Sequence, residues 1–339
     1  MLARAPGRVN LIGDHTDYTG GLVFPMAIDR WTDIRCVGHP DTVRLTSADE
    51  TEPVALPLSI DRPDLVSPPW GRYVAGVISE MTPARGLVGS VTTTIPVGAG
   101  LSSSAALEVA IALALGFTGT PLALAQLCQR AENRASGVPS GIMDQLAIAV
   151  GVAGHALLID CGDLTVTPSA LPADVEIVVQ FVQHRTLVGS PYADRVGECA
   201  AAEAAIGPLR EASLTATRRI DNPVVRARAE HVISENQRVR DFAAALEAGE
   251  LHTAGALMVA SHDSLRDLYQ TSTTVMDAAV EWFLQQRGVY GARMTGGGFG
   301  GCIVALTQPG AIVDSWVVHA VDGAAVIDLD YEPTDGDNT

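Results

Sequence analysis

The chain has 339 residues, of which 22 are basic and 39 acidic, so its formal net charge is −17 at pH 7. A charge of this sign disfavours a nucleic-acid partner, because a duplex-binding surface must supply many cationic contacts to phosphate. Hydrophobic residues make up 47% of the sequence and charged residues 18%, a balance that predicts a globular protein with a sizeable core.

No apolar run of the sequence reaches the roughly 18 to 20 residues of a membrane-spanning helix. Residues 1–6 lead directly into a polar motif, which leaves no room for a signal peptide. We therefore expect a soluble, cytoplasmic protein with no membrane partner.

All of the basic residues are arginine, and lysine is absent from the sequence. A Walker A loop, a protein kinase and a pyridoxal enzyme each require a lysine, so these three classes are excluded. The cysteines form no CxxC pair, and no histidine cluster has the spacing of a zinc site. We expect five reduced, buried thiols, at Cys36, Cys128, Cys161, Cys199 and Cys302.

The first third of the chain alternates short β-branched runs with turn residues, which predicts a sheet-forming region. The expected strands cover residues 22–28, 34–37, 43–45 and 91–95. Residues 61–69 are rich in proline and polar groups, so we expect a surface loop there, ahead of a helix over residues 70–81.

Three helices are expected next. Residues 103–115 are nearly all alanine, leucine and valine, which predicts a helix that is buried on every side. Thr120 and Pro121 open the second helix, since threonine caps helices and proline suits the first helical position. The third is expected to start at Pro139 and to end near Gly151.

The second half of the chain begins with a change from helical to strand patterns. The expected elements are, in order, strands at 156–159 and 175–182, helices over 192–286 with Gly288 as a C-cap, a strand, glycine loop and strand over 293–306, and a strand at 325–329. We expect two domains, residues 1–165 and 166–339, and a frayed acidic tail at 332–339.

Residues 5–21 (APGRVNLIGDHTDYTGG) carry far more hydrogen-bonding capacity than a structural loop requires. Each carboxylate oxygen can accept a hydrogen bond from a sugar hydroxyl, so carboxylates and an imidazole on a short loop suit neighbouring hydroxyls. One such residue alone fits a solvated polar loop, but the cluster favours a sugar site. The polar side chains are Arg8, Asp14, His15, Asp17 and Tyr18.

Residues 96–106 (PVGAGLSSSAA) lie between an expected strand and an expected helix. Glycines let the backbone approach a phosphate, and the N-terminus of a helix presents free N–H groups with a positive dipole end. A turn of this kind is a weak signal of nucleotide binding by itself, and the three serines strengthen it, because their hydroxyls can bind Mg²⁺ or phosphate oxygens.

Residues 293–302 (RMTGGGFGGC) place five glycines among six positions. A flexible hairpin tip is the plain structural interpretation. A loop that must close on phosphates explains the composition better, because an exposed hairpin seldom needs so many permissive positions.

These three segments together resemble the motifs of the GHMP kinase superfamily, and within it the galactokinases. Residues 131–145 are similar to the family's AEH…GxPCGIMDQ, and residues 190–195 to its SxYxxR, all in family order. The resemblance implies an α+β fold of two lobes, an N-terminal ribosomal-protein-S5-like lobe and a C-terminal ferredoxin-like lobe, with the active site in the cleft. It also implies an ATP- and Mg²⁺-dependent sugar kinase of carbohydrate metabolism that phosphorylates the anomeric hydroxyl of a galactose-like sugar.

The resemblance assigns roles by position. It implies that Asp144 is the general base and that Arg8 stabilises the transferring phosphoryl group. The implied Mg²⁺ ligands are Ser104, helped by Ser103, and Glu132. The implied sugar-binding residues are Asp14, His15, Asp17, Gly141 and Tyr192. The implied ATP-binding residues are Trp70, Gly98, Ala99, Gly100, Leu101, Ser102, Ser103, Ser104, Gly297 and Gly298.

Four residues depart from the family pattern. Asp14 replaces a Glu and Asn133 replaces a His. Ser140 replaces a Cys and Val196 replaces a second Arg. Asp14 is one methylene shorter than Glu, which leaves space at the C6 end of the sugar. Galactose is the first expectation. The alternative is a sugar enlarged at C6 or C2, such as a heptose, an octose or an N-acetylhexosamine.

A non-catalytic sugar sensor is an alternative of another class, since some galactokinase-like proteins bind sugar and ATP without turnover. In those the serine–alanine part of the ATP motif is eroded, whereas residues 102–106 are complete here. Both a monomer and a homodimer are compatible with the sequence.

Overall fold

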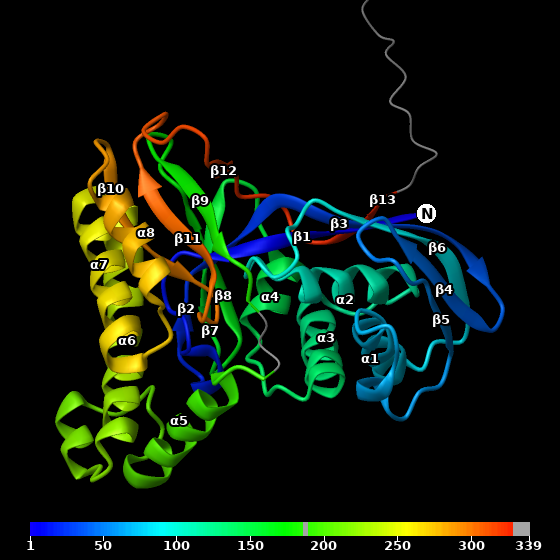
Figure 1. Ribbon diagram of the computed structural model, residues 1–339, viewed down its shortest axis with the longest axis horizontal. Coiled ribbons are helices and arrows are strands. Elements are labelled where there is room, and N and C mark those ends of the chain that lie inside the picture. Colours follow the sequence, from blue (N-terminus) through cyan, green and yellow to red (C-terminus); the bar gives the residue numbers. More distant parts are fainter. Residues whose placement is uncertain (186–188, 328–339) are drawn as a thin grey trace, which may run out of the picture.

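A computed structural model describes residues 1–185 and 189–327. Two large sheets, each covered by helices, lie side by side, with a small third sheet near their junction (Figure 1). None of the helices in these ranges is long and apolar enough to cross a membrane.

The N-terminal sheet has six strands, antiparallel except for the parallel pair β4 and β6. Val43 and Leu45 are buried and alternate with less buried residues, so one face of β4 packs on the core. In order across the sheet the strands are β13 (Ala325–Ile327), β1 (Leu2–Asn10), β3 (Pro25–His39), β6 (Gly86–Thr93), β4 (Thr42–Ser47) and β5 (Val54–Pro57).

Four helices cover one face of this sheet (Figure 1). The helices are α1 (Gly71–Met81), α2 (Ser103–Ala114), α3 (Pro121–Ser136) and α4 (Met143–Val150). Both α2 and α4 contact β1 and β3, while α1 and α3 pack on each other and on α2. Most of α2 is buried, as its alanine-rich composition predicts. The Thr120 hydroxyl caps α3 by accepting from the Ala123 N–H at 3.2 Å, also as predicted.

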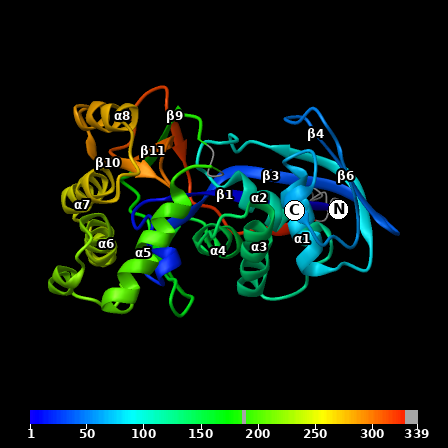
Figure 2. The same ribbon diagram turned by 60° about the horizontal axis from the view of Figure 1, so that its bottom comes forward.

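The second large sheet has the strand order β10 (Val289–Thr295), β11 (Gly301–Thr307), β9 (Glu176–Gln183) and β12 (Trp316–Val318), all antiparallel. Its helices are α5 (Tyr192–Ile206), α6 (Pro223–Glu247), α7 (Leu251–Ser264) and α8 (Thr274–Leu284). Figure 2 shows α6, α7 and α8 gathered on the side of this sheet that faces away from α2 and α3.

Short elements connect the two halves. A three-stranded sheet of β2 (Leu22–Val23), β7 (His155–Asp160) and β8 (Thr165–Ala170) contacts β3 and α6. Short helices of one or two turns lie at η1 (Asp17–Thr19), η2 (Pro63–Leu65), η3 (Leu214–Arg219) and η4 (Leu265–Tyr269). The larger of two apolar cores joins residues of both halves, in which Ile12 of the N-terminal part and Val239 of α6 are completely buried. The second core lies between the C-terminal sheet and its helices and contains Tyr269 and Phe283.

Most expected elements are confirmed, with several differences. Strands β1, β5, β8 and β12 were not expected, and β1 includes residues 5–10 of the expected polar loop. The C-cap of α8 is Gln285 and not Gly288. The strands expected at residues 22–28 and 34–37 are replaced by β2 and by β3, which is a strand of 15 residues. The third helix begins at Met143 and not at Pro139, because the N–H of Ser140 is bound to Oδ1 of Asn133 at 2.9 Å and the chain is held as a loop.

The domain boundary at residues 165 and 166 stays a prediction. It falls at the start of β8, and β13 returns to pair with β1 in the N-terminal sheet. The expected acidic tail at 332–339 and the end of the expected last strand lie outside the described residues. All five cysteines are free thiols; four are buried, and Cys161 is half-buried.

Candidate active site

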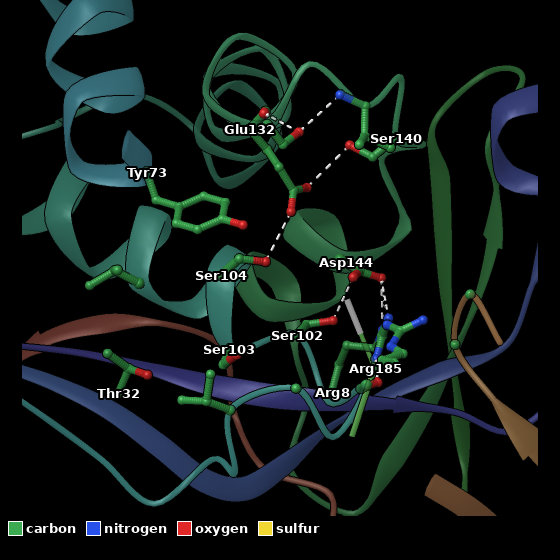
Figure 3. Close-up of a pocket in the computed structure, with 18 of the residues that line it drawn as sticks. Arg8, Thr32, Tyr73, Ser102, Ser103, Ser104, Glu132, Ser140, Asp144 and Arg185 are labelled. Atoms are coloured by element: carbon green, nitrogen blue, oxygen red, sulfur yellow. Dashed lines mark hydrogen bonds and ion pairs between the residues drawn. The ribbon is translucent and has the colours of Figure 1, made fainter. Parts of the chain in front are cut away.

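A cavity of about 360 Å³ lies where β1, the helices α1–α4 and the loop between β10 and β11 meet. Its volume falls within the range of small-molecule sites. Figure 3 shows part of its lining. The predicted site residues that line it are Arg8, Asp14, His15, Asp17, Trp70, Gly98, Gly100, Ser102, Ser103, Ser104, Glu132, Gly141, Asp144, Tyr192 and Gly297.

Three other predicted residues are not among those that line the cavity in the described part of the chain. Ala99 and Leu101 are buried behind it, and the Leu101 carbonyl accepts the backbone N–H of Arg8 at 3.2 Å. Gly298 packs against Thr271, where a Cβ atom would lie 2.5 Å from the carbonyl oxygen. Contact of these three residues with ATP stays a prediction.

The centre of the site is an ion pair between Arg8 at the end of β1 and Asp144 in the first turn of α4. Nε and Nη2 of Arg8 lie 2.8 and 2.7 Å from Oδ1 of Asp144, and Nη1 donates to the Gly100 carbonyl at 2.7 Å. The Arg8 side chain is 2% exposed and that of Asp144 is 26% exposed. Asp144 therefore reaches the cavity while the buried guanidinium fixes its orientation.

Ser102 holds the other oxygen of the same carboxylate. It stands at the N-cap position of α2, where a serine hydroxyl usually accepts a backbone N–H of the helix. Here the hydroxyl instead donates to Oδ2 of Asp144 at 2.5 Å and caps nothing (Figure 3). The first N–H groups of α2 thus have no side-chain cap beside the cavity, which leaves an anion-binding helix end.

Arg185 is a site residue that sequence reasoning missed. It lines the cavity just beyond β9, and its N–H donates to the Gly98 carbonyl at 3.1 Å. Among the described residues its Nη1 atom has no hydrogen-bond partner. Burial lowers the pKa of Arg185, and the charge of Arg8 lowers it further. Arg185 therefore adds a second guanidinium group to the cavity lining, with an Nη1 atom that can bind an anion.

The glycine loop over residues 296–301 closes the same end of the cavity. Gly296 has a φ of 79°, in the left-handed region that favours glycine. A Cβ atom on it would lie 3.2 Å from the Gly100 carbonyl and 3.4 Å from Nη2 of Arg185. The two glycine segments of the sequence therefore touch each other and surround the same arginine.

The polar loop over residues 11–21 forms the neighbouring wall, because Asp14 accepts the N–H of Gly296. Burial raises the pKa of Asp17 to about 7, and the nearby Asp144 charge adds to this effect. A Cβ atom at Gly141 would lie 1.8 Å from Oδ2 of Asp17, so only glycine fits there. His15 and Tyr192 stack with ring centroids 5.4 Å apart. These residues give the wall carboxylate, imidazole and phenol groups.

Asp14 is held by protein groups on both oxygens. Its Oδ2 lies 2.6 Å from Nη2 of Arg293, and its Oδ1 accepts the N–H of Gly296 at 2.9 Å. The sequence indicated Asp14 as a site residue but gave no sign of this partner.

Ser104 and Glu132 lie together on α2 and α3, as the metal prediction requires. The Ser104 hydroxyl donates to Oε1 of Glu132 at 2.9 Å (Figure 3). Gln145 donates to Oε2 of the same carboxylate at 2.7 Å. Burial raises the pKa of Glu132, and the Asp144 charge raises it further. A buried carboxylate and a hydroxyl fit Mg²⁺, which takes one or two protein carboxylates and completes its coordination with phosphate and water oxygens.

Two departures from the family pattern contact each other. The Ser140 hydroxyl lies 2.8 Å from Oδ1 of Asn133 and 3.1 Å from Oε2 of Glu132. The pair therefore supports the Glu132 carboxylate directly. Val196 lies on α5 and is not among the described residues that line the cavity.

The far end of the cavity is aromatic and apolar. Trp70 precedes α1, and its Nε1 donates to the Glu52 carbonyl at 3.0 Å. Tyr73, one helical turn further on, also lines the cavity together with Thr32 and Leu107. Sequence reasoning missed Tyr73, although its spacing from Trp70 places both residues on one helix face.

Three family models match segments of the chain, and curated relatives match most of its length. Residues 1–36 match the galactokinase galactose-binding signature, residues 72–152 the GHMP kinases N terminal domain and residues 242–316 the GHMP kinases C terminal domain. A galactokinase of Roseiflexus sp. is 45% identical over 92% of this chain and 84% of its own length. The human galactokinase is 42% identical over 97% of this chain and 93% of its own.

Solved structures show the same relationship. The structure of Lactococcus lactis galactokinase complexed with galactose has a TM-score of 0.88 and 31% identity, covering 96% of this chain and 94% of that one. A mevalonate kinase, at a TM-score of 0.69 and 19% identity over 95% and 99% of the two chains, shares the fold. These findings confirm the expected two-lobed α+β fold, and the chain belongs to the galactokinase family of GHMP kinases.

Proposed function

We propose that the protein transfers the γ-phosphoryl group of ATP to the anomeric hydroxyl of galactose. The observation that carries the proposal is the Asp144 carboxylate, oriented by Arg8 and Ser102 in a cavity that both the polar loop and the glycine segments line. A sugar against the polar loop and a phosphate against the glycine segments would meet at this carboxylate.

The chemistry follows from the positions of these groups. Phosphoryl transfer depends mainly on alignment and on neutralisation of charge. Asp144 accepts the proton of the sugar hydroxyl as its oxygen attacks the γ-phosphorus, and ADP leaves with the bonding electron pair. Arg8, Arg185 and the uncapped N-terminus of α2 place positive charge where the negative charge of the phosphates gathers.

Ser104 and Glu132 are the residues that would hold Mg²⁺. When bound, the ion neutralises phosphate charge and orients the phosphates. The aromatic end of the cavity, with Trp70 and Tyr73, would take the adenine ring. Nucleotide and metal contacts together would occupy the half of the cavity that lies toward α1–α3.

The contacts of Asp14 favour galactose over an enlarged sugar as the substrate. Both of its oxygens are bound by Arg293 and Gly296, so the shorter side chain is an integral part of the wall. A sugar extended at C6, or modified at C2 as in an N-acetylhexosamine, remains the second candidate, because Asp rather than Glu stands at this position. A sensor is disfavoured, since residues 102–106 and the Arg8–Asp144 pair are complete.

The decisive experiment is a panel of free sugars incubated with ATP and Mg²⁺ in a coupled ADP-release assay. The panel contains galactose, a heptose, an octose and an N-acetylhexosamine, and the product is identified by mass and by phosphorus coupling to the anomeric carbon. We expect galactose to give the highest kcat/KM. ADP release without a sugar phosphate, or coupling to another carbon, would refute the proposal. We also expect a cytoplasmic location and a monomer or homodimer.

A further inference from the structure

His15 is enclosed by tyrosine rings. The centroid of its imidazole lies 4.7 Å from that of Tyr269, 5.4 Å from that of Tyr192 and 5.9 Å from that of Tyr18. Its backbone has a φ of 65°, a conformation uncommon for a residue with a side chain, and the residue is only 4% exposed. The fold therefore fixes the place of this imidazole in the cavity wall.

Behind His15 runs a chain of hydrogen bonds that the proposed reaction does not use. Nδ1 of His15 lies 2.9 Å from the Tyr18 hydroxyl, which lies 2.5 Å from the Tyr269 hydroxyl. The Tyr269 hydroxyl in turn lies 3.0 Å from Sγ of Cys199. Tyr18 and Tyr269 are not among the described residues that line the cavity, so the chain lies behind its surface.

The hydrogen bonds of this chain can point in either of two directions, because each hydroxyl has a single proton to donate. In the first, Cys199 donates to Tyr269, Tyr269 to Tyr18, and Tyr18 to Nδ1 of His15. In the second, every bond is reversed and the sulfur is the last acceptor. A thiol sulfur is a weak acceptor, whereas a neutral imidazole nitrogen is a good one. The first direction is therefore the more stable.

In the first direction the proton of His15 sits on Nε2. This atom is buried and makes no hydrogen bond among the described residues. Burial holds the pKa of His15 well below its usual value, and the charge of His231 lowers it further, so the ring is neutral; a contact with the Gly297 backbone acts in the opposite direction. A neutral ring that receives a proton donor at Nδ1 must be a donor at Nε2.

The Tyr269 end of the hydrogen-bond chain is held rigidly. Arg195 donates through Nε to the Tyr269 carbonyl at 2.7 Å and through Nη2 to the Gln270 carbonyl at 3.0 Å. The His231 ring stacks on Tyr269 with centroids 4.5 Å apart. Tyr269 ends η4, a single π-helical turn, a feature frequent at functional sites. The Tyr269 hydroxyl therefore has a fixed position from which to direct Tyr18.

We propose that Tyr18, directed by Tyr269 and Cys199, is a positioning residue that holds His15 as the neutral tautomer with its proton on Nε2. His15 lines the cavity beside Asp17, so its buried Nε2–H becomes a donor to the sugar when a hydroxyl packs against the ring. The sugar part of this inference rests on the proposed function, whereas the tautomer does not.

The tautomer can be read directly by NMR of the full chain labelled with ¹⁵N-histidine, with the His15 signals assigned by their loss in His15→Gln. We expect the wild-type protein to show a protonated Nε2 and an unprotonated Nδ1 at His15. In Tyr18→Phe the donor to Nδ1 is removed, so we expect the signals of mixed tautomers. A protonated Nδ1 in the wild type would overturn the proposal, as would an unchanged tautomer in Tyr18→Phe.

Kinetics test the consequence for the sugar. We expect Tyr18→Phe to raise the KM for galactose about fivefold to tenfold, the effect of one weakened hydrogen bond, while the KM for ATP stays unchanged. Tyr269→Phe should act in the same direction with a smaller effect, because Tyr18 keeps its proton. Cys199→Ser should also act in this direction, because a hydroxyl accepts a hydrogen bond better than a thiol and so makes the reversed chain more stable. Tyr290→Phe, which removes a phenol outside the cavity lining, is the matched control.

The outcomes separate this inference from the proposed function. If galactose is not a substrate but the wild-type tautomer and its response to Tyr18→Phe are as expected, the proposed function fails and the positioning role stands. If galactose is phosphorylated but Tyr18→Phe leaves its KM unchanged in a protein with the wild-type Tm, the link from Tyr18 to the sugar is refuted. An equal rise in both KM values would mean that the variant disturbs the whole site and would also refute it.

Discussion

Asp14 and Arg293 form an ion pair that is closed off from solvent, with 2.6 Å between Oδ2 and Nη2 and exposed fractions of 1% and 0% for the two side chains. Burial raises the pKa of Asp14, and the charge of Arg293 opposes this effect. Because the other oxygen of Asp14 accepts the Gly296 N–H, the carboxylate joins the polar loop to the glycine loop.

The first prediction concerns sugar preference. Since Arg293 and Gly296 bind both oxygens of Asp14, we expect Asp14→Glu to change the ratio of kcat/KM for galactose and for a heptose by less than about tenfold, the effect of one hydrogen bond. Steady-state kinetics of both proteins on both sugars provide the test. A larger shift toward galactose in the variant would show that the shortened carboxylate enlarges the pocket at C6.

The second prediction concerns the general base. Asp144→Asn keeps the shape of the side chain but cannot accept the proton, so we expect kcat to fall by about 10²- to 10⁴-fold. The affinity for ATP, measured by calorimetry, should stay nearly unchanged. Asp163→Asn, on an exposed loop, is the control. Loss of ATP binding in a folded Asp144→Asn protein would place this residue against the nucleotide instead.

The third prediction concerns Arg185. A hydrogen bond to a charged group contributes about 1.5 to 3 kcal/mol, so Arg185→Gln should raise the KM for ATP by at least about tenfold. The KM for galactose should change little. Arg62→Gln, which removes an exposed arginine paired with Asp64, serves as the control. If the two variants behave alike, the phosphates do not reach Arg185.

The fourth prediction concerns the metal. Mg²⁺ holds strictly to six oxygen ligands, and Ser104→Ala removes one of those assigned here. We expect the Mg²⁺ concentration for half-maximal activity to rise at a saturating ATP concentration. Ser234→Ala, in which the lost hydroxyl donates to the Glu230 carbonyl of α6 away from the cavity lining, is the control. Superimposable Mg²⁺ curves for Ser104→Ala and the wild type would exclude Ser104 as a ligand.

The fifth prediction concerns pH. The pKa of Asp17 is raised from its usual 3.8 to about 7 by burial and by Asp144, so the folded protein binds a proton that the unfolded chain has lost in this range. The stabilisation that this proton gives to the folded state is complete below 3.8, the pKa of Asp17 in the unfolded chain. It is lost as the pH rises to about 7. We expect the Tm of the wild type to fall relative to that of Asp17→Asn between these pH values. Parallel Tm curves would contradict the shift.

The parts of the site that could be predicted are those with local causes. Glycine runs indicate an unusual backbone conformation. Serines before an alanine-rich helix, and a polar loop, indicate hydrogen bonding. Each of these signals lies within a few residues of sequence. Thr120 and Pro121 likewise predicted the start of α3 from local chemistry alone. The motifs therefore predicted Arg8 and Ser104 as site residues, whereas Asp144 was predicted only by the family resemblance of residues 131–145. All three line the cavity.

The parts that could not be predicted depend on contacts between distant segments. Arg185 belongs to no motif, and it becomes a site residue only because β9 ends beside two glycine segments. The partner of Asp14 lies on β10, far along the chain. The start of α4 was wrong for the same reason, because Asn133 of the preceding helix holds Ser140 outside the helix.

The pairing of β13 with β1 has a consequence for synthesis of the chain. Leu2, Ala3 and Arg4 are paired with Ile327, Val326 and Ala325, so β1 gains its second neighbour only when almost the whole chain has left the ribosome. Until then the strand that ends near Arg8 keeps an open edge, which invites pairing with other chains. Deletion of residues 325–327 would make that edge permanent, and solubility should suffer before catalysis does.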